Sequence, residues 1–310
     1  RQMCIRDRYE WLNHFPPQLD AIVQSPHFTN ALEIDPSVIE LRSKALKCFY
    51  YWTKGWSKVL QGHTDTVRVV IKLNETTIVS GSDDRTLRVW DLNDLTSRVL
   101  RGHNHWVTSV IKLNETTIVS GSRDGTLRVW DLNDMLYIPR DLIGHTGKVF
   151  SVIKLNDTTI VSGSQDGTLR VWDLNNLTSR VLRATSEVDS VIKLNETTIV
   201  SSCHAFGDQT LRVWDLTNDT SRVLEGKSPL VKLNETTFVS QSKTRVEEVG
   251  NYLRVWNLSN MNHINSRVLR GHTDPVQSMI KLNETTIVSG SLDGTVRVWD
   301  VNNRTSLVLY

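Results

Sequence analysis

Hydrophobic and polar residues alternate in short runs along most of this chain, and the runs have the length of β-strands. In residues 67–73, aliphatic side chains occupy every second position, and a period of two is typical of a strand. Residues 77–80, 86–90 and 97–100 are further apolar runs, separated by Asn, Asp, Gly and Ser, which favour turns. The pattern predicts a unit of four short strands without a helix.

This unit occurs six times, from residue 57 to residue 310. The string L-R-V-W or V-R-V-W ends at tryptophans that are 40, 42, 42, 42 and 43 residues apart, and K-L-N-[ED]-T-T recurs in step with it. The tryptophans are Trp90, Trp130, Trp172, Trp214, Trp256 and Trp299, and the leading lysines are Lys72, Lys112, Lys154, Lys193, Lys232 and Lys281. One unit of this size cannot bury both of its faces, so neighbouring units must stack.

The combination of motifs resembles the WD40-repeat β-propeller family. Regular units read G-H, then S-G-S-x-D-G-T, then L-R-V-W-D, at a period of 40–43 residues. The resemblance implies an all-β propeller of six four-stranded blades, or a seven-bladed ring with one blade missing or degenerate. We expect a closed ring of six, in which either residues 57–60 or residues 306–309 supply the last fourth strand. The family resemblance also implies a non-catalytic platform for protein or peptide partners.

Four units contain a histidine, a serine and an aspartate before the tryptophan. The sets are His63, Ser80, Asp84 and Trp90; His103, Ser120, Asp124 and Trp130; His145, Ser162, Asp166 and Trp172; and His272, Ser289, Asp293 and Trp299. These residue types can form a hydrolase triad, but an enzyme needs one triad at one cleft, whereas these sets repeat. The resemblance implies a structural hydrogen-bond network in each blade, and a buried histidine needs such partners. We therefore expect no catalytic residues here.

The six leading lysines form a row that could surround one mouth of the channel. A ring of like charge concentrates potential and could hold an anion or an acidic peptide. An acidic residue follows each lysine three positions later, from Glu75 to Glu284, and can neutralise it. Both interpretations stay open.

Positions that differ between the repeats are the candidates for partner binding, because the framework positions barely change. They cluster at the start of the first strand and in the turn before the third strand, which in the family lie on one face. Exposed aromatic residues are frequent interface anchors, so Trp106 and Phe150 are the strongest candidates. The predicted partner-binding set is Thr66, Arg68, Asp83, Trp106, Thr108, Arg123, Lys148, Phe150, Gln165, His204, Phe206, Arg245, Gln277 and Leu292.

The fourth and fifth units depart most from the pattern. Both lack the G-H dipeptide, and both expand the turn before the third strand, to residues 201–208 and 243–251. Loops held by a rigid scaffold often carry recognition. A propeller enzyme is the alternative of another class, and its only candidate residues are His204, Asp208, Glu247 and Glu248 on these turns. Their spacing specifies no reaction and no metal.

Residues 1–56 lack the repeat. Residues 1–8 have no starting methionine and are interpreted as an artefact of sequence assembly. Asp35-Pro36 is a typical helix start, and an apolar stripe from Val38 to Phe49 predicts a short helix. Together with Phe15-Pro16-Pro17-Gln18-Leu19, this segment is distantly similar to the F-box, which implies a substrate receptor of a ubiquitin-ligase-type complex as an alternative function.

Composition narrows the class of protein. The 36 Lys and Arg residues against 34 Asp and Glu residues give a formal charge of +2, so we expect neither a nucleic-acid partner nor a charged membrane surface. Cys4, Cys48 and Cys203 lie far apart, which disfavours disulfides and zinc. No apolar run is long enough to span a bilayer. We expect a soluble cytoplasmic protein with no cofactor, no metal and no membrane insertion.

Overall fold

A computed structural model describes residues 59–134, 136, 138–205, 208–242, 252–260 and 264–309. The chain divides into two compact units, Arg1–Gln61 and Gly62–Tyr310, and every strand lies in the second unit. The described residues form strands and turns only, and they contain no helix that could cross a membrane. The artefact assigned to residues 1–8, the expected helix near residues 35–49 and the F-box-like segment lie outside the described residues.

The strands form six antiparallel sheets of four strands, which we call blades 1 to 6, and this confirms the predicted blade architecture. Blade 1 contains β1 (Val67–Lys72), β2 (Thr77–Ser82), β3 (Thr86–Asp91) and β4 (Ser97–Arg101), and blade 2 contains β5 (Val107–Lys112), β6 (Thr117–Ser122), β7 (Leu127–Asp131) and β8 (Arg140–Leu142). Blade 3 contains β9 (Val149–Lys154), β10 (Thr159–Ser164), β11 (Thr168–Asp173) and β12 (Thr178–Arg183), and blade 4 contains β13 (Val188–Lys193), β14 (Thr198–Ala205), β15 (Asp208–Asp215) and β16 (Thr220–Glu225). Blade 5 contains β17 (Lys227–Lys232), β18 (Thr237–Gln241), β19 (Leu253–Asn257) and β20 (Asn265–Leu269), and blade 6 contains β21 (Val276–Lys281), β22 (Thr286–Ser291), β23 (Val296–Asp300) and β24 (Thr305–Leu309).

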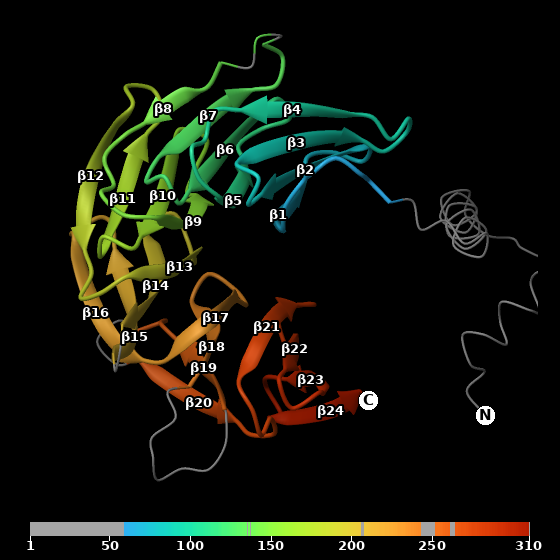
Figure 1. Cartoon of the computed structure of the whole chain (residues 1–310). Coiled ribbons are helices and arrows are strands. Elements are labelled where there is room, and N and C mark those ends of the chain that lie inside the picture. Colours follow the sequence, from blue (N-terminus) through green and yellow to red (C-terminus); the bar gives the residue numbers. More distant parts are fainter. Residues whose placement is uncertain are drawn as a thin grey trace, which may run out of the picture. The chain divides into compact units, whose positions relative to one another are not determined.

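The blades follow one another around a centre, with the first strand of each blade innermost and the fourth strand outermost (Figure 1). Consecutive first strands are neighbours, from the pair β1 and β5 to the pair β17 and β21. We call the side where first strands begin and where the turns between second and third strands lie the loop face. The opposite side, which carries the K-L-N-[ED]-T-T hairpins, is the hairpin face.

The hydrophobic core lies between blades rather than within them. One cluster joins Leu87 and Leu100 of blade 1 to Val107 and Trp130 of blade 2, and four equivalent clusters join each later pair of consecutive blades. Each cluster takes its tryptophan from the later blade of the pair. This arrangement explains the repeat, because a single blade buries its apolar side chains only against its neighbours.

Blades 1 and 6 each have one sheet face exposed to solvent. The equivalent face of the other blades is buried against a neighbouring blade. Val67 of β1 is 46% exposed, whereas its counterpart Val107 is fully buried. At Gly81 in blade 1 an added Cβ would lie 2.6 Å from Val107 of the next blade, but the equivalent Gly290 in blade 6 has no atom within 4 Å of that point. The expected closed ring is therefore not observed among the described residues.

The last fourth strand comes from the C-terminal end of the repeat. Residues Thr305–Leu309 form β24 and pair with β23, whereas Val59 and Leu60 lie in no strand. Of the two segments that the sequence offered for this strand, the C-terminal one forms it.

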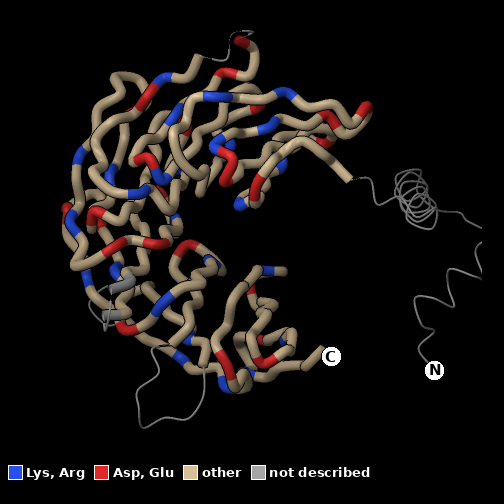
Figure 2. Tube along the Cα trace, viewed as in Figure 1, with Lys and Arg blue, Asp and Glu red and all other residues tan. Residues whose placement is uncertain are grey.

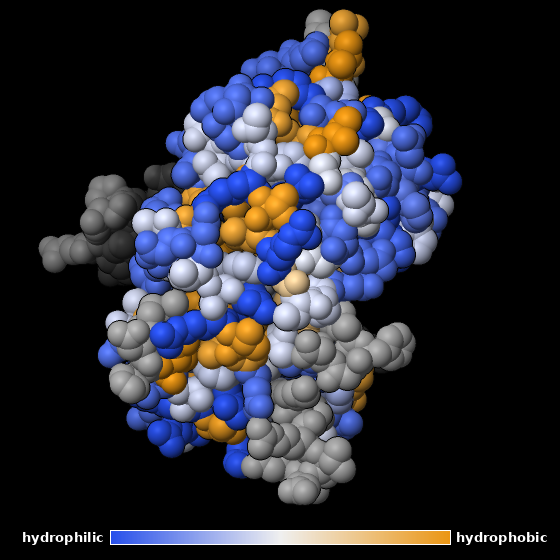
Figure 3. Space-filling view, turned by 90° about the vertical axis from the view of Figure 1, so that its left-hand side faces the viewer, coloured by the Kyte–Doolittle hydropathy of each residue, from blue (hydrophilic) through white to orange (hydrophobic). Residues whose placement is uncertain are grey.

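The surface of the blades mixes both signs of charge, without a long run of either sign along the trace (Figure 2). Figure 3 looks onto the outer side of the propeller, where hydrophobic patches are small and separated by hydrophilic residues. Val181 of β12 and Val223 of β16 are exposed, and each follows an exposed arginine. Isolated apolar residues of this kind are ordinary on a protein surface.

Candidate functional site: the loop face

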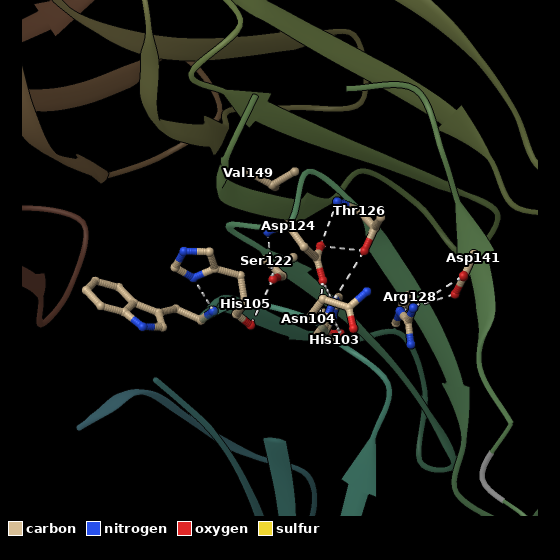
Figure 4. A network of polar contacts seen from close by, with 12 residues as sticks. His103, Asn104, His105, Ser122, Asp124, Thr126, Arg128, Asp141 and Val149 are labelled. Carbon is tan, nitrogen blue, oxygen red and sulfur yellow. Dashed lines mark hydrogen bonds and ion pairs between the residues drawn. The ribbon is translucent and has the colours of Figure 1, made fainter. Parts of the chain in front are cut away.

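Four side chains of blade 2 form one hydrogen-bonded network below the loop face. Nδ1 of His103 lies 2.9 Å from Oδ2 of Asp124, and Nε2 lies 2.7 Å from Oγ of Ser120. Nε1 of Trp130 donates to the same Oγ at 2.8 Å. The backbone N–H and the hydroxyl of Thr126 donate to Oδ1 of Asp124 (Figure 4). The network therefore ties the connection before β5 to the turn before β7 and to β7 itself.

The same network occurs in blades 1, 3 and 6, with the three corresponding distances between 2.7 and 2.8 Å. The structure thus brings together all four sets that the sequence singled out. Each of their serines, Ser80, Ser120, Ser162 and Ser289, is at most 3% exposed. A hydroxyl that is buried and bonded to both an imidazole and an indole braces the blade and offers no accessible nucleophile.

The aspartates of these networks are stabilised as anions. Burial disfavours the charged form of Asp84, but hydrogen bonds from the neighbouring threonine, histidine and backbone N–H groups outweigh burial and lower its pKa to about 2. The same balance lowers the pKa of Asp166 to about 2 and also lowers the pKa values of Asp124 and Asp293. Burial lowers the pKa of His145 and so favours its neutral form. In blade 3 the network thus pairs an ionised carboxylate with a histidine whose neutral form burial favours.

Blades 4 and 5 retain only the bond between tryptophan and serine. Trp214 donates to Ser201, and Trp256 donates to Ser240, both at 2.9 Å. Ala184 occupies the histidine position of blade 4. In blade 5 the connection is shortened, so that Gly226 lies directly against the hydroxyl of Ser240.

The expanded turn of blade 4 extends the sheet. β14 and β15 have eight residues each, and their pairing continues through Cys203 with Thr210 to Ala205 with Asp208. Additional cross-strand hydrogen bonds satisfy the backbone, which favours continued pairing over an irregular loop. The side chains of His204 and Asp208, and residues Phe206, Arg245, Glu247 and Glu248, lie outside the described residues. Among the residues that are described, no group of three His, Cys, Asp or Glu side chains could hold a metal ion.

The row of lysines is engaged in contacts on the hairpin face. Each ammonium pairs with the acidic residue three positions later, at distances such as 2.5 Å for Lys72 with Glu75 and 2.7 Å for Lys154 with Asp157. From Lys112 onward, each lysine also donates to a leucine carbonyl of the preceding blade, as Lys154 does to Leu113 at 2.6 Å. These contacts favour a role in bracing neighbouring blades over the anion site that the sequence left open.

A β-bulge marks the start of the first strand in every blade. In blade 2, Val107 pairs with Ser122 and Ser109 with Gly121, so Thr108 between them has no partner in the ladder. The bulged residues of the other blades are Arg68, Phe150, Asp189, the pair Ser228 and Pro229, and Gln277. Bulges redirect side chains. A position that varies between all the repeats is therefore also one whose backbone is released from regular pairing.

Two arginines from neighbouring blades lie over the indole ring of Trp106. The guanidinium carbons of Arg68 and Arg123 lie 4.9 and 4.2 Å from the ring centroid. Arg68 also forms a bidentate ion pair with Asp83, with contacts of 2.6 to 3.0 Å. Asp83 is only 5% exposed, so its carboxylate is buried against Arg68 and supports that side chain.

Several other predicted residues have internal partners. The Thr108 hydroxyl donates to the Val149 carbonyl at 2.6 Å and therefore joins blade 2 to blade 3. The Gln165 amide donates to Glu187 at 3.1 Å. Thr66, Gln277 and Leu292 are exposed, and Lys148 and Phe150 are half-buried. Most of the predicted residues thus lie on the described loop face. Asp83 and Thr108 are bonded there to other groups of the propeller, Arg68 and the Val149 carbonyl.

Two residues of the loop face were missed by sequence reasoning. The carboxylate of Asp189 accepts hydrogen bonds from Ser202 at 2.6 Å and from Ser228 at 2.7 Å, and Lys227 lines the same hollow. Asp189 occupies the same bulged position as Arg68 and Phe150, so comparison of the repeats could have identified it. Lys227 stands directly after Gly226, where regular units have the histidine of the G-H dipeptide. Its importance depends on the shortened segment between Gly226 and Lys232.

Comparison with known proteins supports the repeat assignment. Residues 56–91, 95–131, 137–173 and 264–300 match the WD40 family model, described as "WD domain, G-beta repeat". These matches fall on blades 1, 2, 3 and 6, which are the four blades with a complete network. Blade 4 and the strands β17 to β19 of blade 5, where the histidine is missing, lie outside the matched ranges.

Sequence relatives share a short segment with this chain. WD repeat-containing protein 37 of Homo sapiens and of Xenopus tropicalis is 54% identical over 39 residues, which is 13% of this chain and 8% of the relative. The aligned part of the chain thus spans under a tenth of these curated relatives. In three dimensions the chain is similar to the structure of U3-55K, with a TM-score of 0.65 and 20% identity over 82% of this chain and 83% of the other. The repeats, the blades and these similarities together show that the chain contains WD40 repeats and has the fold of a WD-repeat β-propeller.

Proposed function

We propose that this chain is a non-catalytic scaffold that binds a partner protein or peptide through its loop face. WD40 propellers generally serve as protein-interaction platforms. The choice of face is supported by a difference in ion pairing between the two faces. On the hairpin face every lysine of the repeated row is ion-paired, whereas Arg123 on the loop face has no ion pair among the described residues.

The surroundings of Arg123 suit a binding contact. Its guanidinium stacks on Trp106, and its Nε atom is buried without a hydrogen-bond partner in the described part of the chain. Stacking holds an arginine in place and leaves its remaining N–H groups free for a carboxylate or a carbonyl oxygen. Arg and Trp are also enriched among the residues that dominate binding energies. We therefore place the centre of the interface at Trp106 and Arg123.

The repeated polar networks support a non-catalytic role. The same four residue types occur in four blades with nearly the same geometry, and their serines are buried. A catalytic group has to reach its substrate. These networks instead supply the rigidity that lets the loop face present its variable side chains.

Site-specific photo-crosslinking tests the proposal. The photoreactive amino acid p-benzoylphenylalanine is placed in the whole chain at Gln277 or Leu292 on the loop face, and at Glu115 or Glu284 on the hairpin face. All four positions are exposed, and thermal melts confirm that each variant is folded. We expect the loop-face variants to crosslink to a shared partner in extracts of the source cells, whereas the hairpin-face variants do not. Crosslinks to a shared partner from the hairpin-face positions alone would contradict the proposed face.

A further inference from the structure

Blade 5 lacks four residues in the connection that carries the histidine in regular blades. Ten residue steps separate Gly102 from Lys112 in blade 2, whereas six separate Gly226 from Lys232 in blade 5. In blade 2 this connection includes His103 and lies over the turn between the second and third strands. Blade 5 has less chain to cover the same place on the loop face.

A hollow of about 380 Å³ lies at this place. It is bounded by blades 4, 5 and 6, with Asp189 and Gln209 from blade 4, Lys227 and Ser228 from blade 5, and Gln277 from blade 6 among its lining residues. The wall offers hydrogen-bonding side chains, while Pro229, Pro275 and Val276 add apolar surface, so the hollow can hold a polar group on an aliphatic stem.

The ammonium of Lys227 has no hydrogen bond or ion pair among the described residues, although the residue is half-buried. Burial lowers the pKa of its ammonium group, with no partner to oppose the shift. Lys232 in the same strand, β17, shows the contrast, because it donates to the Leu194 carbonyl and to Glu235. A partly dehydrated ammonium without a partner is a group that an incoming anion stabilises.

Asp189 limits which anion fits. Its two carboxylate oxygens each accept a hydrogen bond from a serine hydroxyl, Ser202 at 2.6 Å and Ser228 at 2.7 Å. The carboxylate is held in place, and its negative charge remains at the wall of the hollow. One cation beside one anion favours a singly charged ligand over a doubly charged phosphate, because the second charge would be repelled.

We infer that this hollow binds the carboxylate of an aspartate or glutamate side chain of the partner, with Lys227 as its cationic contact. The amides of Gln209 and Gln277, which line the same hollow, are available as further donors. The inference rests on the proposed function, since it assigns one side chain of a partner bound on the loop face. It does not depend on the contact at Trp106 and Arg123.

Nuclear magnetic resonance of the whole chain with ¹³C-dimethylated lysines tests this site without a partner protein. The probe is N-acetylglutamate α-amide, which carries one carboxylate, and sodium chloride at matched ionic strength is the control. Lys227→Arg identifies the Lys227 signal by its absence. We expect a saturable shift of the Lys227 signal and no shift of the Lys232 signal. Isothermal titration calorimetry compares the affinities of the variants, because Lys227→Met removes the Lys227 signal, and we expect this variant to bind the probe about tenfold or more weakly. Lys232→Met is the matched control and should bind the probe like the unsubstituted chain.

Three results would overturn the inference. The Lys227 signal could move no further than in sodium chloride, or Lys227→Met could bind the probe with unchanged affinity. N-acetylphosphoserine amide could also bind more tightly than the carboxylate, which would exclude selection of a single charge. None of these results bears on the crosslinking test, so failure of this site and failure of the proposed face can be told apart.

Discussion

Blades 2 and 5 have the same four-stranded sheet but fix their loops differently. Both contain the buried bond from tryptophan to serine, at 2.8 Å in blade 2 and 2.9 Å in blade 5. Only blade 2 extends this bond through His103 to Asp124 and the overlying connection. The sheet therefore does not require the histidine, whereas the covering connection does. In blade 5 the shorter connection leaves a hollow, and the ammonium of Lys227 in its wall has no partner among the described residues.

Removal of the shared serine should give the largest difference between the two blades. Ser120→Ala leaves Nε2 of His103 and Nε1 of Trp130 without their shared partner, whereas Ser240→Ala strands only Nε1 of Trp256. Each stranded group costs about 1–3 kcal/mol, so we expect Ser120→Ala to reduce the free energy of unfolding about twice as much. Urea denaturation of both variants measures this. Equal losses would show that the histidine bond contributes nothing to blade 2.

The turn before the third strand offers a second comparison, between blade 1 and the other regular blades. Gly125, Gly167 and Gly294 have φ angles of 84°, 75° and 79°, and Arg85 adopts 69° at the same place. An L-residue with a Cβ is strained there by about 1–2 kcal/mol. Arg85→Gly should therefore raise the melting temperature, and Gly125→Arg should lower it. Scanning calorimetry checks both changes, and a lower melting temperature for Arg85→Gly would contradict the argument.

Acid should weaken the regular blades through their aspartates. The pKa values of Asp84 and Asp166 are lowered to about 2 in the folded chain, against about 3.9 for an unperturbed aspartate. A lowered folded pKa stabilises the fold above the unfolded pKa, and this stability is lost as the pH falls from about 4 to about 2. The lowered pKa of His145 acts in the same direction below about pH 6.5.

Urea denaturation from pH 7 to pH 2.5 measures this slope. Asp84→Asn combined with Asp166→Asn should flatten it between pH 4 and pH 2.5, because neither amide titrates. Asp94→Asn is the comparison variant and should flatten the slope less, since the pKa of Asp94 is also lowered, but by hydrogen bonds from Thr96 within one exposed turn. The same slope in the double variant as in the unsubstituted chain would show that the network aspartates do not control acid stability.

The lysine row should give the smallest effect. Lys112→Met removes an ion pair and a bond to the preceding blade, whereas Lys72→Met removes only the exposed pair with Glu75. Exposed ion pairs contribute about 0–1 kcal/mol, so Lys72→Met should be nearly neutral and Lys112→Met measurably worse. Paired thermal melts compare them. A loss from Lys72→Met that matches or exceeds the loss from Lys112→Met would contradict the bracing role.

Most of the blade architecture could be predicted from the sequence. The repeat period, the strand runs and the four histidine networks are local patterns, and the predicted run 77–80 lies within β2 (Thr77–Ser82). Features that depend on contacts between distant residues were harder to predict from the sequence. The burial of Asp83 depends on Arg68 across the first hairpin, and the uncovered faces of blades 1 and 6 depend on which surfaces meet. The hollow at Lys227 depends on a deletion whose effect appears only when three blades are assembled.

The most direct test of the account measures partner affinity and melting temperature on the same samples. The partner is the protein crosslinked from the loop face, and the variants are His103→Ala, Arg123→Ala and Glu115→Ala. We predict that His103→Ala melts earlier but binds normally when folded, and that Arg123→Ala binds about tenfold or more weakly with little change in melting. Glu115→Ala should change affinity little. Weaker binding in Glu115→Ala together with unchanged binding in Arg123→Ala would contradict recognition by the loop face.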